Sequence, residues 1–276
     1  MSTTTTRRSP RPVGELLREW RERRRLSQLD LSIQADISTR HLSFVETGRS
    51  RPTSEMILRL SEQLDVPLRE RNTLLLAGGF APAFPAHDLD APALDAVRTA
   101  LRQVLTGHEP YPAVVVNRSW ELVDANSAIA LFTADAAAEL LSPPVNVLRL
   151  SLHPDGMAPR IANLGEWRAH LLARLRREAE VTADPVLDAL HRELRGYPGG
   201  DSTTVTGRPD VVVPLRFRHD YGELRFFSIT AVVGSPADVT VAELAIESFY
   251  PADRETGDEL RRLSGTGSTS ARSAAT

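Results

Sequence analysis

The amino-acid sequence predicts two domains of different fold class. An all-α domain of five helices covers residues 13–77, and an α+β domain with one five-stranded antiparallel sheet covers residues 94–253. The length of 276 residues suits two domains at roughly 100–200 residues each. The first part carries only helical periodicity, whereas the second also shows the alternation of strands. Between them, glycine and proline interrupt every periodicity at 78–93, which predicts a linker.

The five helices of the first domain follow from apolar spacing and from residues that favour helix ends. The first helix is predicted by one apolar stripe, formed by Val13, Leu16, Leu17 and Trp20. The other four begin at residues that cap a helix or suit its first turn, namely Ser27, Ser38, Ser54 and Pro67. Gly48 is expected to end the third helix.

The second domain reads as two strands, then helices, then three strands, an order that favours an antiparallel sheet. The predicted strands are 111–116, 120–124, 213–218, 227–233 and 239–250. Pro214 cannot donate to a neighbouring strand, so an edge strand or a bulge is expected there. Asn163 and Glu166 have the spacing of a capping box. The core face of the fourth strand is expected to consist of the alternating residues Phe227, Ile229, Ala231 and Val233.

Charge is distributed unevenly along the chain. The formal net charge is −3, and every basic residue is arginine. Residues 1–80 hold 14 Arg against 10 acidic residues, whereas the remainder holds 19 Arg against 26. A basic first domain suits a polyanionic partner, and an acidic second domain does not. The lack of cysteine excludes a disulfide scaffold, a thiolate metal site and a cysteine nucleophile, and fits a cytoplasmic protein.

Both ends of the chain are predicted to lie outside the folded domains. Residues 1–12 are rich in Ser, Thr and Arg with no apolar segment behind them, which indicates a flexible arm rather than a secretory signal. In a second interpretation, Arg7, Arg8 and Arg11 contact DNA phosphates or the minor groove. Residues 254–276 end in a Ser/Thr/Gly/Ala-rich stretch, and we expect a disordered tail there. No stretch approaches the roughly 18 apolar residues that span a bilayer.

The most specific motif lies at residues 26–52. Two short helices are joined by the tight turn Asp36-Ile37-Ser38, and the small Ala35 allows them to approach closely. The Ser27-Gln28 entry, the Ile37-Ser38 turn and the exit at 46–49 resemble Xre-type helix-turn-helix domains of phage repressors, over residues 13–77. The resemblance implies that the second motif helix enters the major groove of DNA. The alternative is a helix-turn-helix kept only for protein contacts.

The outward side of this motif supplies the predicted DNA contacts. Gln28 and Ser38 begin helices, whose N-termini meet phosphate. Arg40 is expected to bind a guanine edge, and Thr39 and Phe44 a thymine methyl group. The further predicted contacts are His41, Ser43, Thr47, Arg49 and Arg51, of which the last three are assigned to phosphates. Glu46 is expected to pair with an arginine inside the domain, and a contact with a base is the alternative. Because two half-sites one helical turn apart add their recognition energies, we expect a homodimer on a near-palindromic operator.

The second domain carries another resemblance. Residues 112–126, 146–149 and 244–253, together with Trp167-Arg168 and Leu175-Arg176, resemble the ligand-binding domain of MmyB-like transcription regulators. The match covers residues 94–253 and implies a PAS-like fold. It also implies a small-molecule ligand, such as a fatty acid or a similar lipid.

A ligand in such a domain needs an apolar cavity with a few polar groups. The aromatic candidates are Trp120, Phe132, Trp167, Phe217 and Phe227, with Phe249 as a further inward ring. The polar candidates are Asn126, His153, Arg160, Arg168 and His170. Of these, Asn126 is expected near the cavity mouth, and Arg160 or Arg168 suits a ligand carboxylate. The alternatives are an ordinary packed core for the aromatic residues and surface or helix-cap contacts for the polar ones.

Together these observations predict a sequence-specific, ligand-responsive DNA-binding regulator. The sequence contains no G-x-S-x-G, no H-E-x-x-H, no P-loop and no G-x-G-x-x-G at a strand–helix junction. We therefore expect no catalytic residues, no metal and no resident cofactor. Two alternatives remain: an enzyme tethered to DNA, and a regulator whose second domain binds a protein partner without a small molecule.

Overall fold

The computed structural model describes residues 11–200, 212–220 and 222–273. Predictions for the arm at 1–12 therefore lie outside the described residues, except at Arg11 and Pro12. The chain forms two compact units, one made mainly of Met1–Ala86 and the other of His87–Ala179, Ala183–Pro236 and Thr240–Thr276. The boundary between them falls inside the predicted linker.

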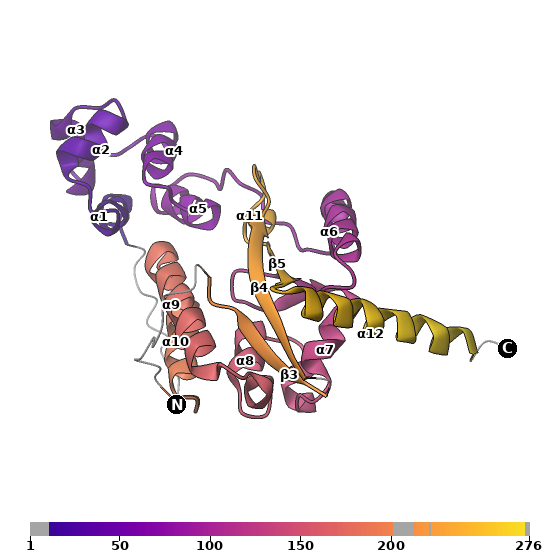
Figure 1. Cartoon of the computed structure of the whole chain (residues 1–276). Helices are drawn as coiled ribbons and strands as arrows, with labels where there is room; N and C mark the ends of the chain where they lie inside the picture. Colours follow the sequence, from indigo (N-terminus) through magenta and orange to yellow (C-terminus); the bar gives the residue numbers. More distant parts are fainter. Residues whose placement is uncertain (1–10, 201–211, 221, 274–276) are drawn as a thin grey trace, which may run out of the picture. The chain divides into compact units, whose positions relative to one another are not determined.

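The helical unit consists of five α-helices, as the sequence predicts (Figure 1). They are α1 (Val13–Arg23), α2 (Gln28–Gln34), α3 (Thr39–Glu46), α4 (Ser54–Gln63) and α5 (Leu68–Ala77). One apolar core joins them, and Leu17, Leu31, Leu42 and Ile57 in it are fully buried. Each of these four residues comes from a different helix, so the core fixes all of α1 to α4 together.

Short polar side chains set the helix starts. The Ser27 hydroxyl accepts from the Asp30 amide at 3.1 Å, and the Asp30 carboxylate accepts from the Ser27 amide at 3.0 Å, which completes a capping box. Hydrogen bonds from Ser27 lower the pKa of the Asp30 carboxyl. Ser38 caps α3 by accepting from the His41 amide at 3.2 Å. α4 begins at Ser54, as predicted, and Thr53 caps it by accepting from the Met56 amide at 3.2 Å.

Gly14 sets the distance between α1 and the end of α3. A Cβ atom at Gly14 would lie 2.1 Å from the carbonyl oxygen of Val45. That separation is far below van der Waals contact, so only glycine fits here without moving one of the two backbones. The position of α3 relative to α1 therefore depends on a missing side chain.

The second unit contains one antiparallel five-stranded sheet, which confirms the predicted fold class. Its strands are β1 (Ala113–Val116), β2 (Leu122–Ala125), β3 (Leu215–His219), β4 (Gly222–Val232) and β5 (Ala245–Pro251). Their order across the sheet is β2-β1-β5-β4-β3, so the last strand in sequence occupies the centre. β3 forms one edge directly after Pro214, as expected for a strand that proline precedes.

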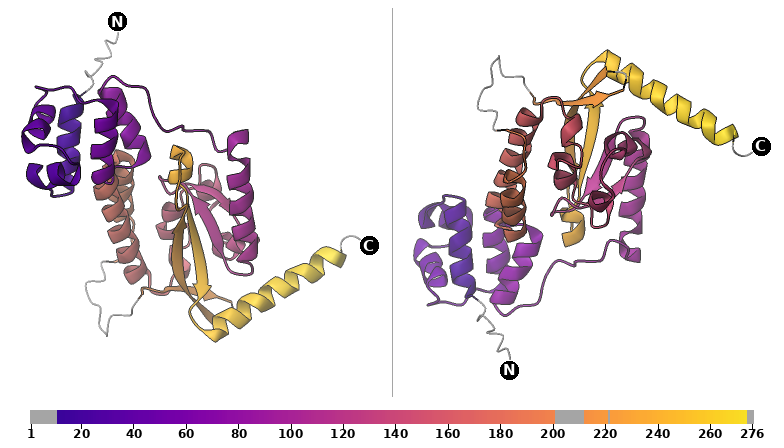
Figure 2. Two further views of the ribbon diagram at one scale, coloured as in Figure 1. Left: turned by 90° about the horizontal axis from the view of Figure 1, so that it is seen from above. Right: turned by 90° about the horizontal axis from the view of Figure 1, so that it is seen from below.

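Helices cover the two faces of the sheet differently (Figure 2). On one face, α6 (Asp95–Gly107) places Leu101 and Leu105 against Ala113 and Val115 of β1. On the other lie the elements that follow β2, namely α7 (Ala130–Thr133), α8 (Val147–Leu152), α9 (Leu164–Thr182) and α10 (Pro185–Arg195). Short 3₁₀ turns complete the unit at Pro92–Leu94, Ser127–Ile129, Ala138–Leu141 and Ala158–Arg160. The larger core lies on this second face.

The predicted core face of β4 is wrong. Leu224 and Phe226 point into the larger core, whereas Ile229 and Val233 are exposed by 48% and 37%. Phe227 lies on the α6 side of the sheet and stacks on Tyr250 with ring centroids 5.5 Å apart. Because Phe226 and Phe227 are adjacent, either set of alternating residues could face the core. The set that does face it also contains the polar residues Ser228 and Thr230, so in the sequence it resembles a face exposed to solvent.

Three other expectations also need correction. The predicted strand 239–250 is a helical turn, α11 (Val239–Ala242), followed by β5, because alternating Val239 and Val241 suit one turn of helix equally well. The predicted disordered tail contains α12 (Arg254–Ser273), which buries Leu260. Asn163 makes no capping bond, because its amide bridges instead to Pro214 and Arg216 beside β3, at 2.8 and 3.1 Å.

Candidate functional site

The outward side of α3 forms the first candidate site. Leu42 and Val45 of this helix are buried, whereas Arg40, Ser43 and Phe44 keep accessible surface. This division is the one that helical spacing predicts. Asp36 in the turn before α3 adopts a left-handed backbone with φ of 50°, a conformation that aspartate tolerates better than most residues. The turn therefore presents α3 with one face in the core and one face open.

Phe44 lies between two arginines on this open face. The guanidinium carbon of Arg40 is 5.3 Å from the Phe44 ring centroid, and that of Arg49 is 5.9 Å away. Both distances are within the range of a cation–π contact. Because the ring already restricts the rotamers of both arginines, each arginine loses less conformational entropy when it binds an anion or a base edge. The structure thus gives Phe44 a contact that the sequence did not predict.

The other predicted DNA-contacting residues surround this arginine pair. Thr39 shares a 2.8 Å hydrogen bond with Ser32 of α2, and the Thr47 hydroxyl donates to the Ser43 carbonyl at 2.7 Å. Both threonine hydroxyl groups are thus engaged within the unit, which leaves their methyl groups as the contact surface. The remaining accessible positions around α3 are Ser38, His41, Ser43, Thr47, Arg49 and Arg51.

A buried polar cluster fixes α1, α2 and α3 to one another. Arg21 binds Glu46 through two parallel hydrogen bonds of 2.6 and 2.9 Å, and it also donates to the Leu26 carbonyl at 2.8 Å. The side chain of Gln28 donates to the same carboxylate at 2.8 Å. Glu46 therefore pairs with an arginine inside the domain, as expected. These contacts raise the pKa of Arg21, first through the Glu46 hydrogen bond and against the opposing effect of burial.

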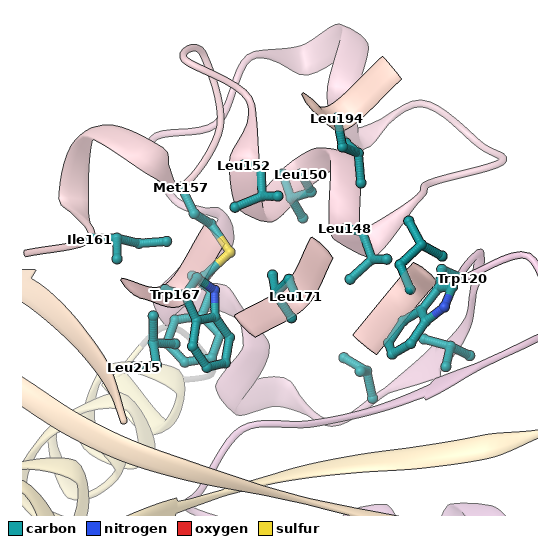
Figure 3. Close-up of a cluster of buried hydrophobic side chains, with 14 of the residues drawn as sticks. Trp120, Leu148, Leu150, Leu152, Met157, Ile161, Trp167, Leu171, Leu194 and Leu215 are labelled. Atoms are coloured by element: carbon teal, nitrogen blue, oxygen red, sulfur yellow. The ribbon is translucent and has the colours of Figure 1, made fainter. Parts of the chain in front are cut away.

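The second candidate site is a cavity of about 280 Å³ in the sheet unit. Its floor is the inner face of the sheet, and its walls come from α7, α8 and α9. Apolar side chains form most of the lining, and Figure 3 shows Leu171 drawn between the indoles of Trp120 and Trp167. Of the predicted aromatic residues, the lining includes Trp120, Phe132, Trp167 and Phe249. The cavity therefore brings together residues from both ends of the domain sequence.

The polar end of the cavity was not predicted from the sequence. Arg174 of α9 and Glu247 of β5 both line the cavity and form a 2.6 Å ion pair, with Ser228 of β4 beside them. Arg174 also binds Glu178 at 3.1 Å, and its guanidinium lies 4.5 Å from the Trp120 ring centroid. Burial alone would lower the pKa of Arg174, but Glu247 and Glu178 outweigh it and the pKa is raised. Arg174 is therefore a fixed cation with two carboxylate partners.

Models of two known protein families match the two parts of this chain. The model of the MmyB-like transcription regulator ligand binding domain matches residues 97–263, which is more than half of the chain. The chain belongs to the MmyB-like transcription regulators. A helix-turn-helix family model matches residues 17–71 of the same chain. The protein is thus a DNA-binding transcription regulator with a ligand-sensing domain, and both matched families are regulatory.

Other comparisons add little. No curated protein matches this regulator. A solved structure described as an RNA-binding light-oxygen-voltage receptor aligns with 15% identity and a TM-score of 0.25 over 93% of this chain and 64% of that chain. The regulator therefore spans less than two thirds of that receptor's length.

Several predicted ligand residues of this MmyB-like domain lie outside the cavity lining. Phe217 is fully buried behind Phe132, with ring centroids 5.2 Å apart, and Phe227 lies on the opposite face of the sheet. The amide of Asn126 is used within the fold, because it accepts from Ala113 at 3.1 Å and donates to Tyr111 at 2.8 Å. It joins the end of β2 to the start of β1.

The predicted basic residues also serve other contacts. His153 packs edge-on against Tyr197 at 5.0 Å, and Arg160 lies over Phe217 at 4.8 Å. Arg168 donates to the Arg195 carbonyl at 2.8 Å, which ties α9 to the end of α10. His170 stacks on Trp167, and burial followed by the charges of Arg174 and Arg177 lowers its pKa. The polar residue that does line the cavity on α9 is Arg174, seven residues after Trp167 and on the same face.

Within residues 11–200, 212–220 and 222–273, none of the helices combines the length and the hydropathy of a membrane span.

Proposed function

We propose that this MmyB-like regulator reads specific DNA sequences through the open face of α3 and responds to a small, largely apolar molecule held in the cavity of its sheet unit. The observation that carries the first part is the pair Arg40 and Arg49 held on Phe44 at the surface of the recognition helix. The observation that carries the second part is an apolar cavity with one polar end.

Arg40 is assigned to a guanine edge and Arg49 to phosphate. A bidentate arginine–guanine contact discriminates against other bases by about 1–3 kcal/mol, whereas a phosphate contact is independent of sequence. Arg40→Ala should therefore weaken binding to the operator and leave binding to a base-shuffled duplex nearly unchanged. Arg49→Ala should weaken both equally. The operator is obtained first by genome-wide capture of bound DNA, and affinities are then measured by fluorescence anisotropy of labelled duplexes.

Arg262→Ala provides a matched control, because Arg262 is exposed on α12 in the other unit. An equal loss on both duplexes for Arg40→Ala would reassign Arg40 to phosphate. No loss on either duplex would remove it from the interface. Salt dependence is an independent measure, with an expected slope of log affinity against log salt of about −0.9 for each phosphate neutralised.

A homodimer on a near-palindromic operator fits a recognition helix that is only eight residues long. One such helix reads few base pairs, and two half-sites one helical turn apart extend the sequence that is read. Sedimentation of the protein–DNA complex should give two protein chains per operator. Inserting half a helical turn between the half-sites should abolish tight binding, and tolerance of that insertion would contradict the dimer geometry.

The cavity lining suits the hydrocarbon part of a fatty-acid-like lipid. Native mass spectrometry of freshly purified protein should show a retained non-covalent mass of a few hundred daltons. Leu148→Phe, which fills the cavity, should lose that mass. If neither a retained mass nor a thermal shift with lipids is found, the sheet unit acts through protein contacts instead.

A ligand that regulates must favour one DNA-binding state over another. If the ligand changes the affinity of the protein for the operator by some factor, the operator must change the affinity of the protein for the ligand by the same factor. Titration of the ligand with and without operator DNA measures this factor directly.

A further inference from the structure

Most polar side chains of the cavity lining are already used within the fold. Among the described residues that line the cavity, those with a hydroxyl or charged side chain are Thr133, Ser151, Arg174, Ser228 and Glu247. The charges of Arg174 and Glu247 cancel in their 2.6 Å ion pair. The Thr133 hydroxyl donates to the Ile129 carbonyl at 3.4 Å. The hydroxyl groups of Ser151 and Ser228 remain to be considered.

Ser151 of α8 has a hydroxyl proton that the fold does not use. The residue is only 7% exposed, and its oxygen accepts from the Trp167 indole at 3.0 Å. An indole N–H can only donate, so the Ser151 proton takes no part in this bond. Other buried helical serines give that proton to the carbonyl three residues earlier, as Ser32 and Ser61 do at 2.8 Å. Within the described part of the chain, Ser151 makes no such bond.

The bond from Trp167 also makes Ser151 a better donor. A hydroxyl group that accepts a hydrogen bond is polarised by it, and its own O–H group then donates more strongly. Both residues line the cavity. The partner that the Ser151 proton lacks is therefore an acceptor, and a molecule in the cavity can supply one.

The charge balance of the lining limits what this molecule can be. Arg174 binds Glu247 at 2.6 Å and Glu178 at 3.1 Å, so the lining offers no uncompensated positive charge. A carboxylate in the cavity would be buried without a countercharge of its own, which is unfavourable in apolar surroundings. An ammonium group would meet the same difficulty, because Glu247 is already paired. An uncharged acceptor, such as a carbonyl oxygen, avoids both costs.

From these contacts we infer that the cavity binds an uncharged carbonyl compound with a long alkyl chain, such as a ketone or an ester, and that Ser151 donates a hydrogen bond to its carbonyl oxygen. The inference rests on the proposed ligand-binding function and names the chemistry of the ligand. Ser151 recognises the carbonyl group, and the Arg174–Glu247 pair makes the cavity unfavourable for a charged head group.

Three probes with equal numbers of carbon atoms test this: 2-tridecanone, tridecanoic acid and tridecane. Each is delivered from cyclodextrin to the full-length protein near pH 7, and its affinity is measured by isothermal titration calorimetry. 2-Tridecanone should bind about fivefold more tightly than tridecane, which corresponds to one net hydrogen bond. It should bind at least about tenfold more tightly than tridecanoate, which must enter either as a buried anion or with a proton taken up well above its pKa.

Ser151→Ala should bring the affinities for 2-tridecanone and tridecane to about the same value, because the donor is lost. The affinity for tridecane shows whether the cavity is still intact in this variant. Ser151→Thr keeps a hydroxyl group and should keep the preference. Ser142→Ala is the matched control and should also keep it, since Ser142 is exposed, donates to the Ala138 carbonyl at 3.1 Å and is absent from the lining.

Glu247→Gln tests the role of the ion pair. It leaves Arg174 as the charged side chain among the described lining residues, so the preference for 2-tridecanone over tridecanoate should fall by about tenfold. Glu193→Gln is the control, because Glu193 pairs with Arg149 and is absent from the lining. It should keep the preference of the unmodified protein.

Infrared spectroscopy of bound 2-tridecanone, labelled with ¹³C at its carbonyl, tests the hydrogen bond directly. A carbonyl group that accepts a hydrogen bond absorbs at a lower wavenumber than the same group in an alkane. The bound ketone should show this lowering in the unmodified protein and in Ser228→Ala. Ser151→Ala should return the band toward its position in alkane.

Each outcome decides one point. Equal binding of 2-tridecanone and tridecane, or a bound carbonyl band at the alkane position, overturns the inference while the apolar cavity keeps its proposed function. Tridecanoate that binds as tightly as 2-tridecanone overturns the uncharged chemistry, and an unchanged preference in Glu247→Gln overturns the role of the ion pair. A preference lost in Ser228→Ala but kept in Ser151→Ala overturns the assignment of Ser151. Failure of all three probes removes the ligand-binding function itself.

Discussion

Among the described residues, each unit of this regulator holds an arginine–glutamate pair whose carboxylate is buried, and the two pairs are used differently. In the helical unit, Arg21 and Glu46 are joined at 2.6 Å, and both carboxylate oxygens accept hydrogen bonds from within the fold. In the sheet unit, Arg174 and Glu247 are joined at the same distance, but both residues also line a cavity, and the hydrogen bonds that Glu247 accepts from Arg174 and Thr230 both end on its Oε1 atom. The two pairs therefore differ in whether hydrogen bonds reach both carboxylate oxygens, and not in the burial of the carboxylate.

A pair whose carboxylate oxygens all accept hydrogen bonds within the fold can only hold the structure together. A pair at a cavity wall, with an oxygen that no such bond reaches, can also bind a molecule. The free energy of unfolding should therefore depend strongly on the first pair. Ligand selection should depend on the second. Substitutions of the same kind at the two glutamates compare these roles directly.

The largest effect is expected for Glu46→Gln. Removing the charge leaves Arg21 buried without its anion, and breaking a buried pair in this way costs about 3–5 kcal/mol. Hydrogen exchange of amides in α1 and α3 measures this local stability separately from the sheet unit. The control is Glu19→Gln, because Glu19 pairs with Arg11 at an exposed site and should change stability by less than about 1 kcal/mol. Similar protection in the two variants would contradict a structural role for the Arg21–Glu46 pair.

A smaller loss is expected for Gly14→Ala. The added methyl group would overlap the Val45 carbonyl, and overpacking of this kind costs about 1–3 kcal/mol. The shift of α3 should also reduce operator affinity. Gly107→Ala at the end of α6 is the control, since a Cβ atom there meets nothing within 4 Å. If denaturant titration shows Gly14→Ala to be as stable as the control, the close approach of α1 to α3 is wrong.

Glu247→Gln should cost less stability than Glu46→Gln. Arg174 keeps Glu178 as an anionic partner, so about 1 kcal/mol is expected, comparable to one hydrogen bond. Chemical denaturation of the sheet unit measures it. A loss as large as that of Glu46→Gln would show that both pairs are equally structural, and the comparison between the two units would fail.

The smallest effect concerns pH. Hydrogen bonds from Arg149 lower the pKa of Glu193 to about 2, against a value of 4.5 for the free side chain. A depressed folded-state pKa contributes stability that is present above pH 4.5 and is lost as the pH falls toward 2. Both side chains are 38% exposed, so solvent screening limits the effect to less than about 1 kcal/mol. Glu193→Gln should flatten this acid limb in thermal melts, and an unchanged limb would argue against the pair.

The sequence predicted the helical unit more completely than the sheet unit. The turn at 36–38, the open face of α3 and the internal pair of Glu46 all follow from local spacing and capping, because contacts in a helix-turn-helix are short-range. The strands were also recognisable. What failed was the inward face of β4, since its inward residues Ser228 and Thr230 are polar and pack beside a cavity rather than in solvent.

The cavity shows why aromatic residues were predicted better than polar ones. Trp120, Phe132 and Trp167 are inward in any amphipathic interpretation, and they line the cavity. Arg174 and Glu247 were missed, although each is a charged residue at an apolar position: Arg174 continues the stripe of Trp167 and Leu171 on α9, and Glu247 interrupts a central strand. Asn126, Arg160 and Arg168 look like binding residues in sequence, yet the structure uses them in contacts with backbone atoms, the Phe217 ring and the Asp135 carboxylate.

The positions of the tryptophans have a practical consequence. The chain has three, of which Trp120 and Trp167 line the cavity, while Trp20 lies in the helical unit beneath the guanidinium groups of Arg23 and Arg24. In a Trp20→Phe variant, tryptophan fluorescence would come from the cavity walls alone. In a variant with phenylalanine at the other two positions, tryptophan fluorescence would come from the helical unit alone. The protein thus carries its own optical labels, one set for each unit.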